Sequence, residues 1–543
     1  FRDRDHLEQY INTLDDFEIV TIVLDKDDDN PQKVFESINS TGKPLTDGDK
    51  IRNFSLMLHT SEKQDYVLTN YWQHIETYLT DPQRDDITDF FRVYLIAKNQ
   101  SVVNTDKVYP EFKKAFSNNI SDDQSYESLD TFYGEILRIL KYYRFLKFDI
   151  DVNNEFTKLK SAAFIMRYLR IEAFFPYVVS VMKYWQDGHL SDDEIAEVFD
   201  VLCVYFSRRI VVNLSTASLD NYFAGLHRNI LSSVEQNDAV YIEVLKYTML
   251  SRSGQTRLPR NNEIETAIKA NFTYNQRSSN VMYLLTAVDD ESKDVSLLKQ
   301  INNKELHLTI EHIMPQTLSG EWKAMLGDNF EEIQEKYLHT FANLTLTGIN
   351  SELSNKPFAI KRDGKAIGNE IYPGYRNSKY RLTKNVTLCE KWTETELQNR
   401  SNEIVAIFLR LYPLPQTTFK PLPKPVDEVS LEEESFTPTN RQLKGFRLFG
   451  NEYTETTWKE MLLRVVKMVE QQYTDIVDTL YDAEGFFWSA QQADTRYCTQ
   501  IAPQKYLWTS MDNRSKLRCL RFLFEKCDIA ESELVMLLEP IRE

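Results

Sequence analysis

Two short segments with alternating apolar residues stand out from a chain whose pattern is otherwise mostly helical. In the first, HLTIEH, the apolar residues Leu308 and Ile310 alternate with polar neighbours. The second, NLTLT, repeats the alternation with Leu344 and Leu346. Because successive side chains of a strand point to opposite faces, the pattern predicts two short strands, each with one buried face. Residues 301–412 are therefore predicted to form a small module of strands and helices.

The length of 543 residues exceeds what one hydrophobic core supports, so several domains are expected. Hydrophobic residues make up 42% of the chain and charged residues 27%, with only 15 Gly, which is typical of a globular protein rich in helix. The sequence predicts a mainly α multidomain protein. The predicted parts are residues 1–60, a helical domain at 61–300, the module at 301–412, a linker at 413–440 and a C-terminal domain at 441–543.

The range 61–300 carries apolar residues at helical spacing. Its clearest helix is LSDDEIAEVFDVLCVYFSRR, in which Ser191 and Glu194 predict a capping box. Stripes of this kind are ordinary core and indicate no cofactor site. The three predicted stripes are Ile195, Val198, Phe199, Leu202 and Phe206; Leu68, Trp72, Ile75 and Leu79; and Phe132, Ile136, Ile139, Leu140 and Tyr143.

Beyond residue 412, proline and acidic residues become dense, as in an extended linker. The sequence FRLFGNEY then predicts a hairpin with its turn at Gly450 and Asn451, and Thr457 with Glu460 predicts a capped helix. These patterns favour a small C-terminal α+β domain.

The net charge of -18 argues against a protein that coats nucleic acid indiscriminately, since such binding requires clustered cations. One stretch differs: from Lys356 to Lys384 there are eight basic and two acidic residues, a net charge of +6 (8 minus 2). That stretch could face a phosphate backbone.

The five cysteines are scattered and form no CxxC pair, so reduced thiols are expected. No run approaches the roughly 20 apolar residues of a membrane span, and no leader opens the chain. A cytoplasmic location without membrane contact is the expectation.

The two predicted strands carry residues suited to phosphodiester hydrolysis. His312 lies at the end of the first, Asn343 opens the second, and Asn350 or Asn355 follows it. Histidine is the natural base near neutral pH, and a cation can neutralise charge on the reacting phosphate. The order of these residues resembles the ββα-metal fold of HNH nucleases. By that resemblance His312 is the general base, Asn343 braces the hairpin through backbone hydrogen bonds, and Asn350 contributes to a metal site, with Asn355 as its rival.

Glu311 stands where many HNH enzymes place a metal-binding Asp. Adjacent side chains of a regular strand point to opposite faces, so Glu311 and His312 share a site only if the backbone bends. His339 could touch phosphate or the metal, although packing or a surface hydrogen bond is as ordinary a role. The predicted DNA-binding residues are Lys356, Lys361 and Arg362, although a Lys-Arg pair on a helix is usually a solvated face.

The run EHIMPQ, then Trp322, then LHTFANLTLTGINSELSNKPFAIK resembles the nuclease half of the GmrSD-type, modification-dependent (type IV) restriction proteins. Upstream, VFESINSTGKPLTDGDKIRNFSLM at 34–57 resembles a segment of that family's other half, an α/β ParB-like nucleotide-hydrolysing domain. Residues 1–60, with a β-rich strand at 17–25, would then be a C-terminal remnant of this domain.

The DGQQR signature of the ParB-like half is absent from the chain. Either a segment precedes residue 1 or the chain lacks nucleotide hydrolysis. The resemblance implies that Asn39, Gly42 and Lys43, with Asp49 as a further family-like position, contact a nucleoside triphosphate.

Together the resemblances predict a DNA endonuclease or nickase of a bacterial anti-phage restriction system, dependent on Mg²⁺ or Mn²⁺. Its partner would be modified phage DNA, a nucleotide would regulate it, and it could form a homo-oligomer. The alternative is a non-cleaving DNA or nucleotide sensor with the same fold. A further alternative assigns recognition of the modified base to Phe486, Phe487 or Trp488, for which burial in the domain core is the more ordinary fate.

Overall fold

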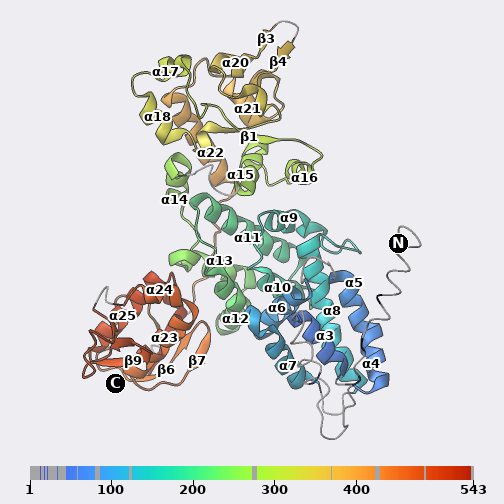
Figure 1. Ribbon diagram of the computed structural model, residues 1–543, viewed down its shortest axis with the longest axis vertical. Coiled ribbons are helices and arrows are strands. Elements are labelled where there is room, and N and C mark those ends of the chain that lie inside the picture. The colour runs from blue at the N-terminus through green and yellow to red at the C-terminus, as the bar shows by residue number, and fades with distance from the viewer. Residues whose placement is uncertain are drawn as a thin grey trace. The chain divides into compact units, whose positions relative to one another are not determined.

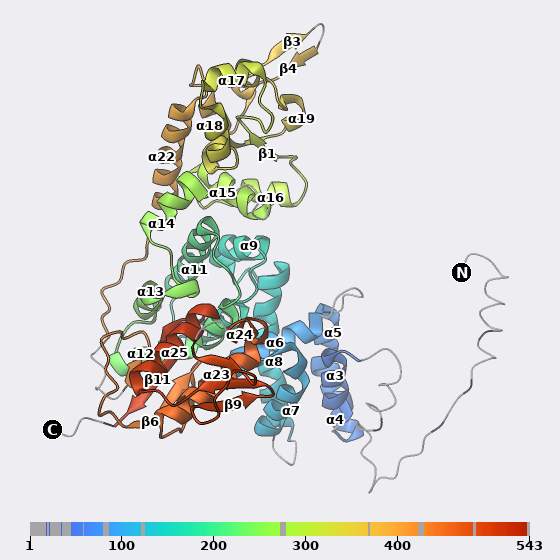
Figure 2. The ribbon, with the colours of Figure 1, turned by 60° about the vertical axis from the view of Figure 1, so that its left-hand side comes forward.

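The computed structural model (Figures 1 and 2) describes residues 45–57, 59–79, 86–120, 125–271, 278–367, 370–421, 428–481 and 485–539, together with Thr13, Glu18, Thr21 and Val34. Most of the predicted strand at 17–25 and the predicted nucleotide-binding residues Asn39, Gly42 and Lys43 lie outside the described residues.

The chain divides into two compact units. The first comprises Phe1–Leu95 and Val103–Arg138, and the second Ile96–Val102 and Ile139–Glu543. The predicted helical domain at 61–300 is thus shared between the units, while the boundaries at 300 and 412 stay predictions.

The first unit is helical and has an aromatic core. Each of the rings of Phe54, Phe112, Phe116 and Phe132 makes edge or tilted contacts with at least two of the others, with centroids 5.4–6.4 Å apart. Such pairs add to the free energy gained from burial alone. Its helices are α3 (Asp47–Met57), α4 (Ser61–Val67), α5 (Gln73–Leu79), α6 (Asp86–Asn99), α7 (Val108–Asn119) and α8 (Tyr126–Phe148), of which α6 and α8 continue into the second unit.

One predicted stripe is shifted by a local irregularity. Between α4 and α5 the backbone forms a π-helical turn at Leu68–Trp72, which inserts an extra residue into the helical repeat. As a result Leu68 is only half-buried, and Val67 and Tyr71 enter the core in its place. The rest of that stripe and the whole stripe on α8 are buried as predicted.

The helices of the second unit that precede the strands continue the pattern. All five residues of the stripe predicted on α11 are at most 3% exposed. The helices are α9 (Lys160–Tyr168), α10 (Phe175–Gln186), α11 (Asp192–Val212), α12 (Leu219–Asn237), α13 (Tyr241–Ser251), α14 (Asn261–Thr266), α15 (Ser278–Asp290) and α16 (Ser296–Asn302).

The capping box predicted at the start of α11 is confirmed. The Ser191 hydroxyl accepts a hydrogen bond from the Glu194 amide at 3.2 Å, and the Glu194 carboxylate accepts one from the Ser191 amide at 2.8 Å. We expect Ser191→Ala to lower the free energy of unfolding by about 1 kcal/mol, because the Glu194 amide at the helix end loses its hydrogen-bond partner. Denaturant unfolding of the variant and the wild type measures this difference, and an unchanged midpoint would contradict the role of the box.

Residues 301–412 contain the two predicted strands, β1 (Thr309–His312) and β2 (Leu344–Thr347), paired antiparallel. Helices α15 and α21 pack against β2, and α19 packs against β1. The other elements are α17 (Gly320–Leu326), α18 (Phe330–Tyr337), η6 (Phe341–Asn343), α19 (Asn350–Leu353), α20 (Phe358–Asp363), β3 (Lys365–Ile367), β4 (Glu370–Tyr372), η7 (Tyr375–Asn377), α21 (Arg381–Val386) and α22 (Glu394–Leu411).

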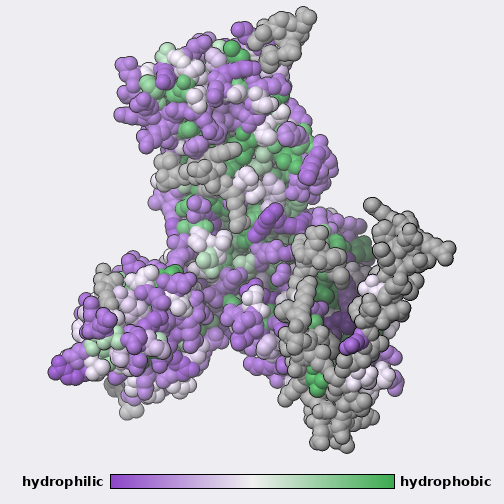
Figure 3. Space-filling model, viewed as in Figure 1, coloured by the Kyte–Doolittle hydropathy of each residue, from purple (hydrophilic) through white to green (hydrophobic). Residues whose placement is uncertain are grey.

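The C-terminal part has its own core and is an α+β domain, as predicted. Helix α23 packs on β6 and α25, and the face of the domain seen in Figure 3 is mostly hydrophilic. The sheet orders are β5-β11-β6-β7 and β8-β10-β9. The elements are β5 (Glu428–Ser430), β6 (Leu443–Leu448), β7 (Asn451–Tyr453), α23 (Trp458–Gln472), α24 (Thr474–Asp478), β8 (Phe487–Ser489), β9 (Cys498–Ala502), β10 (Lys505–Trp508), α25 (Asn513–Lys526) and β11 (Leu534–Leu538).

Two details of this domain differ from the prediction. Strand β5 falls in the predicted linker, where it pairs with β11 and buries Val429, so the domain includes residues before 441. The hairpin turn is one residue earlier than expected: Phe449 and Gly450 both have positive φ, 50° and 76°. Positive φ at both central residues gives a turn whose twist matches the strands it joins.

The fold class is thus mainly α with small sheets, as the sequence predicts. All five cysteines are free thiols. Of the predicted base-stacking residues, Phe487 is fully buried and Phe486 packs against the domain core. Among the described residues, no helix combines the length and the apolar character that a membrane span requires.

Candidate active site

The β1–β2 hairpin places His312 directly opposite Leu344 and Glu311 opposite Thr345. The predicted exposed face does not exist: Glu311 and every residue of β2 are buried, and only Thr309 is half-exposed in β1. The second face is covered by α21, whose Thr383 hydroxyl forms a hydrogen bond of 2.8 Å with the Thr345 hydroxyl. The hairpin is therefore an internal scaffold with two different environments.

His312 ends β1 and is 8% exposed. Its Nε2 lies 3.2 Å from Nδ1 of His339, and the two rings meet edge to face with centroids 5.2 Å apart. Burial, with smaller contributions from His339 and Lys361, lowers the pKa of His312 to about 4. The imidazole is therefore neutral at pH 7 and able to accept a proton.

Because burial lowers the pKa of His312, the stability of the folded chain should depend on pH. Between pH 6.5 and about 4 the unfolded chain binds a proton at His312 that the folded chain does not, so stability falls as the pH falls through this window. We expect His312→Gln to remove this contribution, whose upper bound is about 3 kcal/mol. The measurement is the difference in unfolding free energy between wild type and variant at each pH from 4 to 7. This difference isolates His312, because His227, whose pKa is also about 4, makes the same contribution in both proteins. A difference that does not vary with pH would contradict the burial argument.

Asn343 is fully buried and fixes the backbone just past β1. Its Oδ1 accepts from the Met314 amide at 2.7 Å, while its Nδ2 donates to the carbonyls of Met314 at 2.9 Å and Leu338 at 3.0 Å. Its own carbonyl accepts from the Ile313 amide at 2.9 Å. This is the bracing arrangement that the family resemblance implies for this residue.

Asn350 opens α19, as the resemblance implies, and its Nδ2 donates to the Ile310 carbonyl at 2.8 Å. Its Oδ1 makes no hydrogen bond within the described part of the chain. Asn355 is exposed in the turn after α19. Of the two candidates for the third residue of the HNH-like motif, Asn350 is the one that is hydrogen-bonded to strand β1.

The structure corrects the predictions for Glu311 and Lys361. The Lys361 ammonium donates to Glu311 Oε1 at 2.7 Å and to the His312 carbonyl at 2.8 Å, and the Tyr375 hydroxyl donates to the same Glu311 oxygen at 3.1 Å. Lys361 is 0% and Glu311 3% exposed, so Lys361 does not present its charge to DNA. Burial raises the pKa of Glu311 and lowers that of Lys361.

Arg362 and Lys356 are the other two predicted DNA-binding residues. Arg362 donates to the Asp363 carboxylate at 2.6 Å and to the Cys389 carbonyl at 3.1 Å, which leaves it little freedom to bind phosphate. Lys356 is half-exposed, and its carbonyl accepts from Trp322 Nε1 at 3.0 Å. The +6 stretch is therefore less basic at its surface than its sequence indicates.

The donor set expected for Mg²⁺ or Mn²⁺ is not assembled. These ions prefer carboxylate and carbonyl oxygens, but Glu311 is neutralised by an ammonium 2.7 Å away, and only the Asn350 oxygen remains of the predicted pair. Within the described residues, no group of three or more His, Cys, Asp or Glu side chains could hold a metal.

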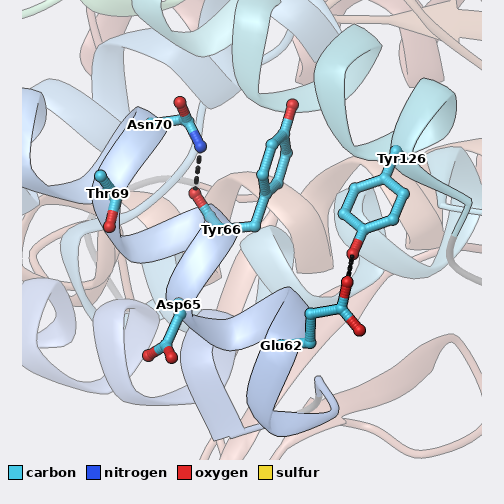
Figure 4. A pocket seen from close by; sticks show the side chains of 6 residues that line it. All are labelled: Glu62, Asp65, Tyr66, Thr69, Asn70 and Tyr126. Atoms are coloured by element: carbon cyan, nitrogen blue, oxygen red, sulfur yellow. Dashed lines mark hydrogen bonds between the residues drawn. The ribbon is translucent and has the colours of Figure 1, made fainter.

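The first unit holds a pocket of about 560 Å³, whose lining is seen in Figure 4. It is lined by Glu62, Asp65, Tyr66, Thr69, Asn70 and Tyr126, and the Tyr126 hydroxyl donates to Glu62 at 3.0 Å. Two carboxylates and no cation make this lining unsuited to a nucleotide phosphate. Asp49, the remaining family-like position, accepts from the Thr46 amide at 3.0 Å and so caps the start of α3.

A family model covers the region that contains the hairpin. Residues 258–407 match the family model described as the C-terminal domain of GmrSD restriction endonucleases. No curated protein matches the chain. The match begins well before the boundary predicted at residue 301 and so includes α15, which packs against β2. Residues 258–407 are therefore similar to the C-terminal domain of GmrSD restriction endonucleases.

Proposed function

We propose that residues 258–407 hydrolyse DNA phosphodiester bonds and that His312 is the general base. The observation that carries the proposal is the position of His312. A neutral imidazole ends the first strand of a hairpin within a domain that matches restriction endonucleases.

In the proposed reaction His312 takes a proton from a water molecule, whose oxygen attacks the phosphorus. The bond to the leaving deoxyribose oxygen breaks, and that oxygen gains a proton from solvent. A pKa near 4 makes the free imidazole a weak base. The approaching phosphate carries negative charge, which stabilises imidazolium and raises the pKa towards neutral pH once DNA is bound.

His339 supports this role through its contact of 3.2 Å with His312. One of the two facing nitrogens must donate to the other, so the contact selects complementary tautomers for the two rings. His339 is half-exposed and could pass the proton from His312 to solvent. Asn343 supports the site indirectly by holding residues 313 and 314 in place.

Dependence on Mg²⁺ or Mn²⁺ remains a prediction based on the HNH resemblance, since the pair Glu311 and Asn350 does not form a site. The HNH type has the same basis, whereas the predictions of a type IV enzyme of phage defence, directed at modified DNA and regulated by a nucleotide, rest on the resemblance to GmrSD-type restriction proteins. The resemblance of residues 34–57 to a ParB-like segment supports the last of these.

A non-cleaving DNA sensor is the second candidate, and one observation favours it. The carboxylate next to the proposed base is bound to Lys361. A hydrolase that requires Glu311 as a metal ligand would be inactive in this arrangement, whereas a binding protein would not be affected.

The decisive experiment incubates the full chain with modified and unmodified phage DNA, with and without Mg²⁺, Mn²⁺ and nucleoside triphosphates. We expect strand cleavage of one DNA class, and the metal and nucleotide arms determine the cofactors. Retention of intact DNA on the protein in every arm would support the sensor and overturn the endonuclease.

Contact between Lys356 and a DNA phosphate would change how strongly the affinity for DNA depends on salt concentration. We expect Lys356→Ala, in a His312→Ala background that cannot cut, to weaken DNA binding and to reduce the slope of log affinity against log salt by about 1. Lys336→Ala is the matched control, because it removes one lysine charge from α18, outside the basic stretch from Lys356 to Lys384. Equal slopes for both variants would contradict a phosphate contact at Lys356.

A further inference from the structure

We propose that Lys361 and Glu311 are positioning residues for His312, in which the Lys361 ammonium anchors the backbone of the base and occupies the carboxylate beside it. The inference rests on the proposed nuclease function. It assigns to both residues a role other than the DNA contact that the basic stretch predicts for Lys361 and the metal ligation that the HNH resemblance implies for Glu311.

The anchor acts at the point where the strand ladder ends. Beyond His312 the strand pairing stops, and the Ile313 amide instead binds the Asn343 carbonyl at 2.9 Å. Asn343 then holds both polar backbone groups of Met314. The His312 carbonyl itself is held by Lys361 at 2.8 Å. Each residue from 312 to 314 therefore has a backbone group that is hydrogen-bonded to a buried partner. Removal of the Lys361 ammonium releases the backbone of His312, the proposed base.

Lys361 meets the requirements of a fixed donor. It lies in the last turn of α20, and its aliphatic stem is enclosed, since its side chain is only 1% exposed. An ammonium has three donors, of which one is used on Glu311 and one on His312. Because both partners are adjacent residues of β1, a single side chain fixes the end of the strand relative to α20.

Glu311 completes the arrangement by supplying the countercharge. A buried ammonium without an anion would be strongly disfavoured, and Glu311 Oε1 accepts from both Lys361 and Tyr375. A divalent cation placed on the same carboxylate would lie a few ångströms from the ammonium, at a high electrostatic cost in so dry a site. The pair thus occupies the position in which the HNH resemblance expects a metal ligand.

The test uses a double variant, Glu311→Gln with Lys361→Met, which removes both charges at nearly constant volume and so avoids an unpaired buried ion. Thr345→Val is the matched control. It deletes a buried hydrogen bond on the same face of the hairpin, to Thr383 at 2.8 Å, in a residue that pairs with Glu311 and not with His312 across the strands.

We expect the double variant to lower kcat by about 100-fold, the effect of a misplaced catalytic group, with KM for DNA and the salt slope unchanged. The midpoint of a Mn²⁺ titration should also stay where the wild type has it. Thr345→Val should keep the wild-type kcat. A wild-type kcat in the double variant overturns the proposal. A salt slope reduced by about 1 would overturn it in favour of a DNA contact by Lys361. A Mn²⁺ midpoint moved to higher concentration would overturn it in favour of Glu311 as a ligand.

A second readout separates this proposal from the proposed function. Hydrogen exchange at the amides of residues 312–314 does not depend on cleavage. We expect exchange there to be faster in the double variant than in Thr345→Val. If the wild type cuts no DNA, the proposed nuclease function is wrong, but this measurement still tests whether Lys361 anchors the backbone. Equal exchange in the two variants would overturn the anchoring role whether or not the protein cuts DNA.

Discussion

Replacement of His312 by alanine should lower the rate of DNA cleavage by a factor of roughly 10² to 10⁴ and leave the fold intact. The variant removes the base that takes the proton from water. The ring of His312 lies 3.2 Å from His339 and, with its pKa lowered to about 4, is neutral at pH 7, so its removal takes no countercharge from a buried ion. Binding of DNA should be retained, because His312 is 8% exposed and contributes little surface.

The matched control is His307→Ala, which changes an exposed histidine just before the same strand. It should cut DNA at the wild-type rate. Cleavage is measured as product formed per unit time under single-turnover conditions, so that product release does not mask the chemical step. Undiminished cutting by pure His312→Ala protein would remove His312 from the mechanism.

Features that depend on neighbouring residues along the chain could be predicted from the sequence. The capping box at Ser191, the stripe on α11 and the two strands of the hairpin follow from spacings of two to four residues, which local geometry translates directly into structure. The position of His312 at the end of β1 follows for the same reason, whereas Asn343, predicted to open the second strand, is the last residue of η6, directly before β2.

Features that depend on distant partners could not be predicted. Lys361 reaches Glu311 across 50 residues, so the sequence presents it as one more cation of a basic stretch while the fold buries it completely. The strands appear half-polar in sequence, yet the threonines of β2 are buried because α21 supplies a hydroxyl partner to Thr345. A buried polar residue with a distant partner cannot be distinguished by pattern from an exposed one.

Buried arginines show the same limit and connect the site to the helices around it. Arg400 of α22 donates to the carbonyls of Leu382 at 2.9 Å and Leu344 at 3.2 Å, and Leu344 is the strand partner of His312. Arg208 of α11 binds the carbonyl of Tyr412, just past the end of α22. Helix α22 is thus held at one end by the helical region while its middle supports the hairpin, so the position of the base depends on residues far outside the predicted motif.

Asn343→Ala should be the most destabilising change in this region, with a loss of roughly 3 kcal/mol or more. The substitution leaves the Met314 amide and the carbonyls of Met314 and Leu338 without partners in a site that is closed to water. Each buried backbone group without a partner costs about 1 to 3 kcal/mol. Cleavage should be lost as well, since residues 313 and 314 no longer hold the end of β1.

Hydrogen exchange is the appropriate measurement, because a chain with two compact units need not unfold in one step. The amides of β1 and β2 should exchange faster in Asn343→Ala, while those of the C-terminal domain, which has a separate core, should not change. The exposed Asn355 serves as the control, and Asn355→Ala should alter the free energy by less than about 0.5 kcal/mol. Unchanged exchange in β1 together with lost cleavage would mean that Asn343 acts on the DNA or the attacking water rather than on the backbone.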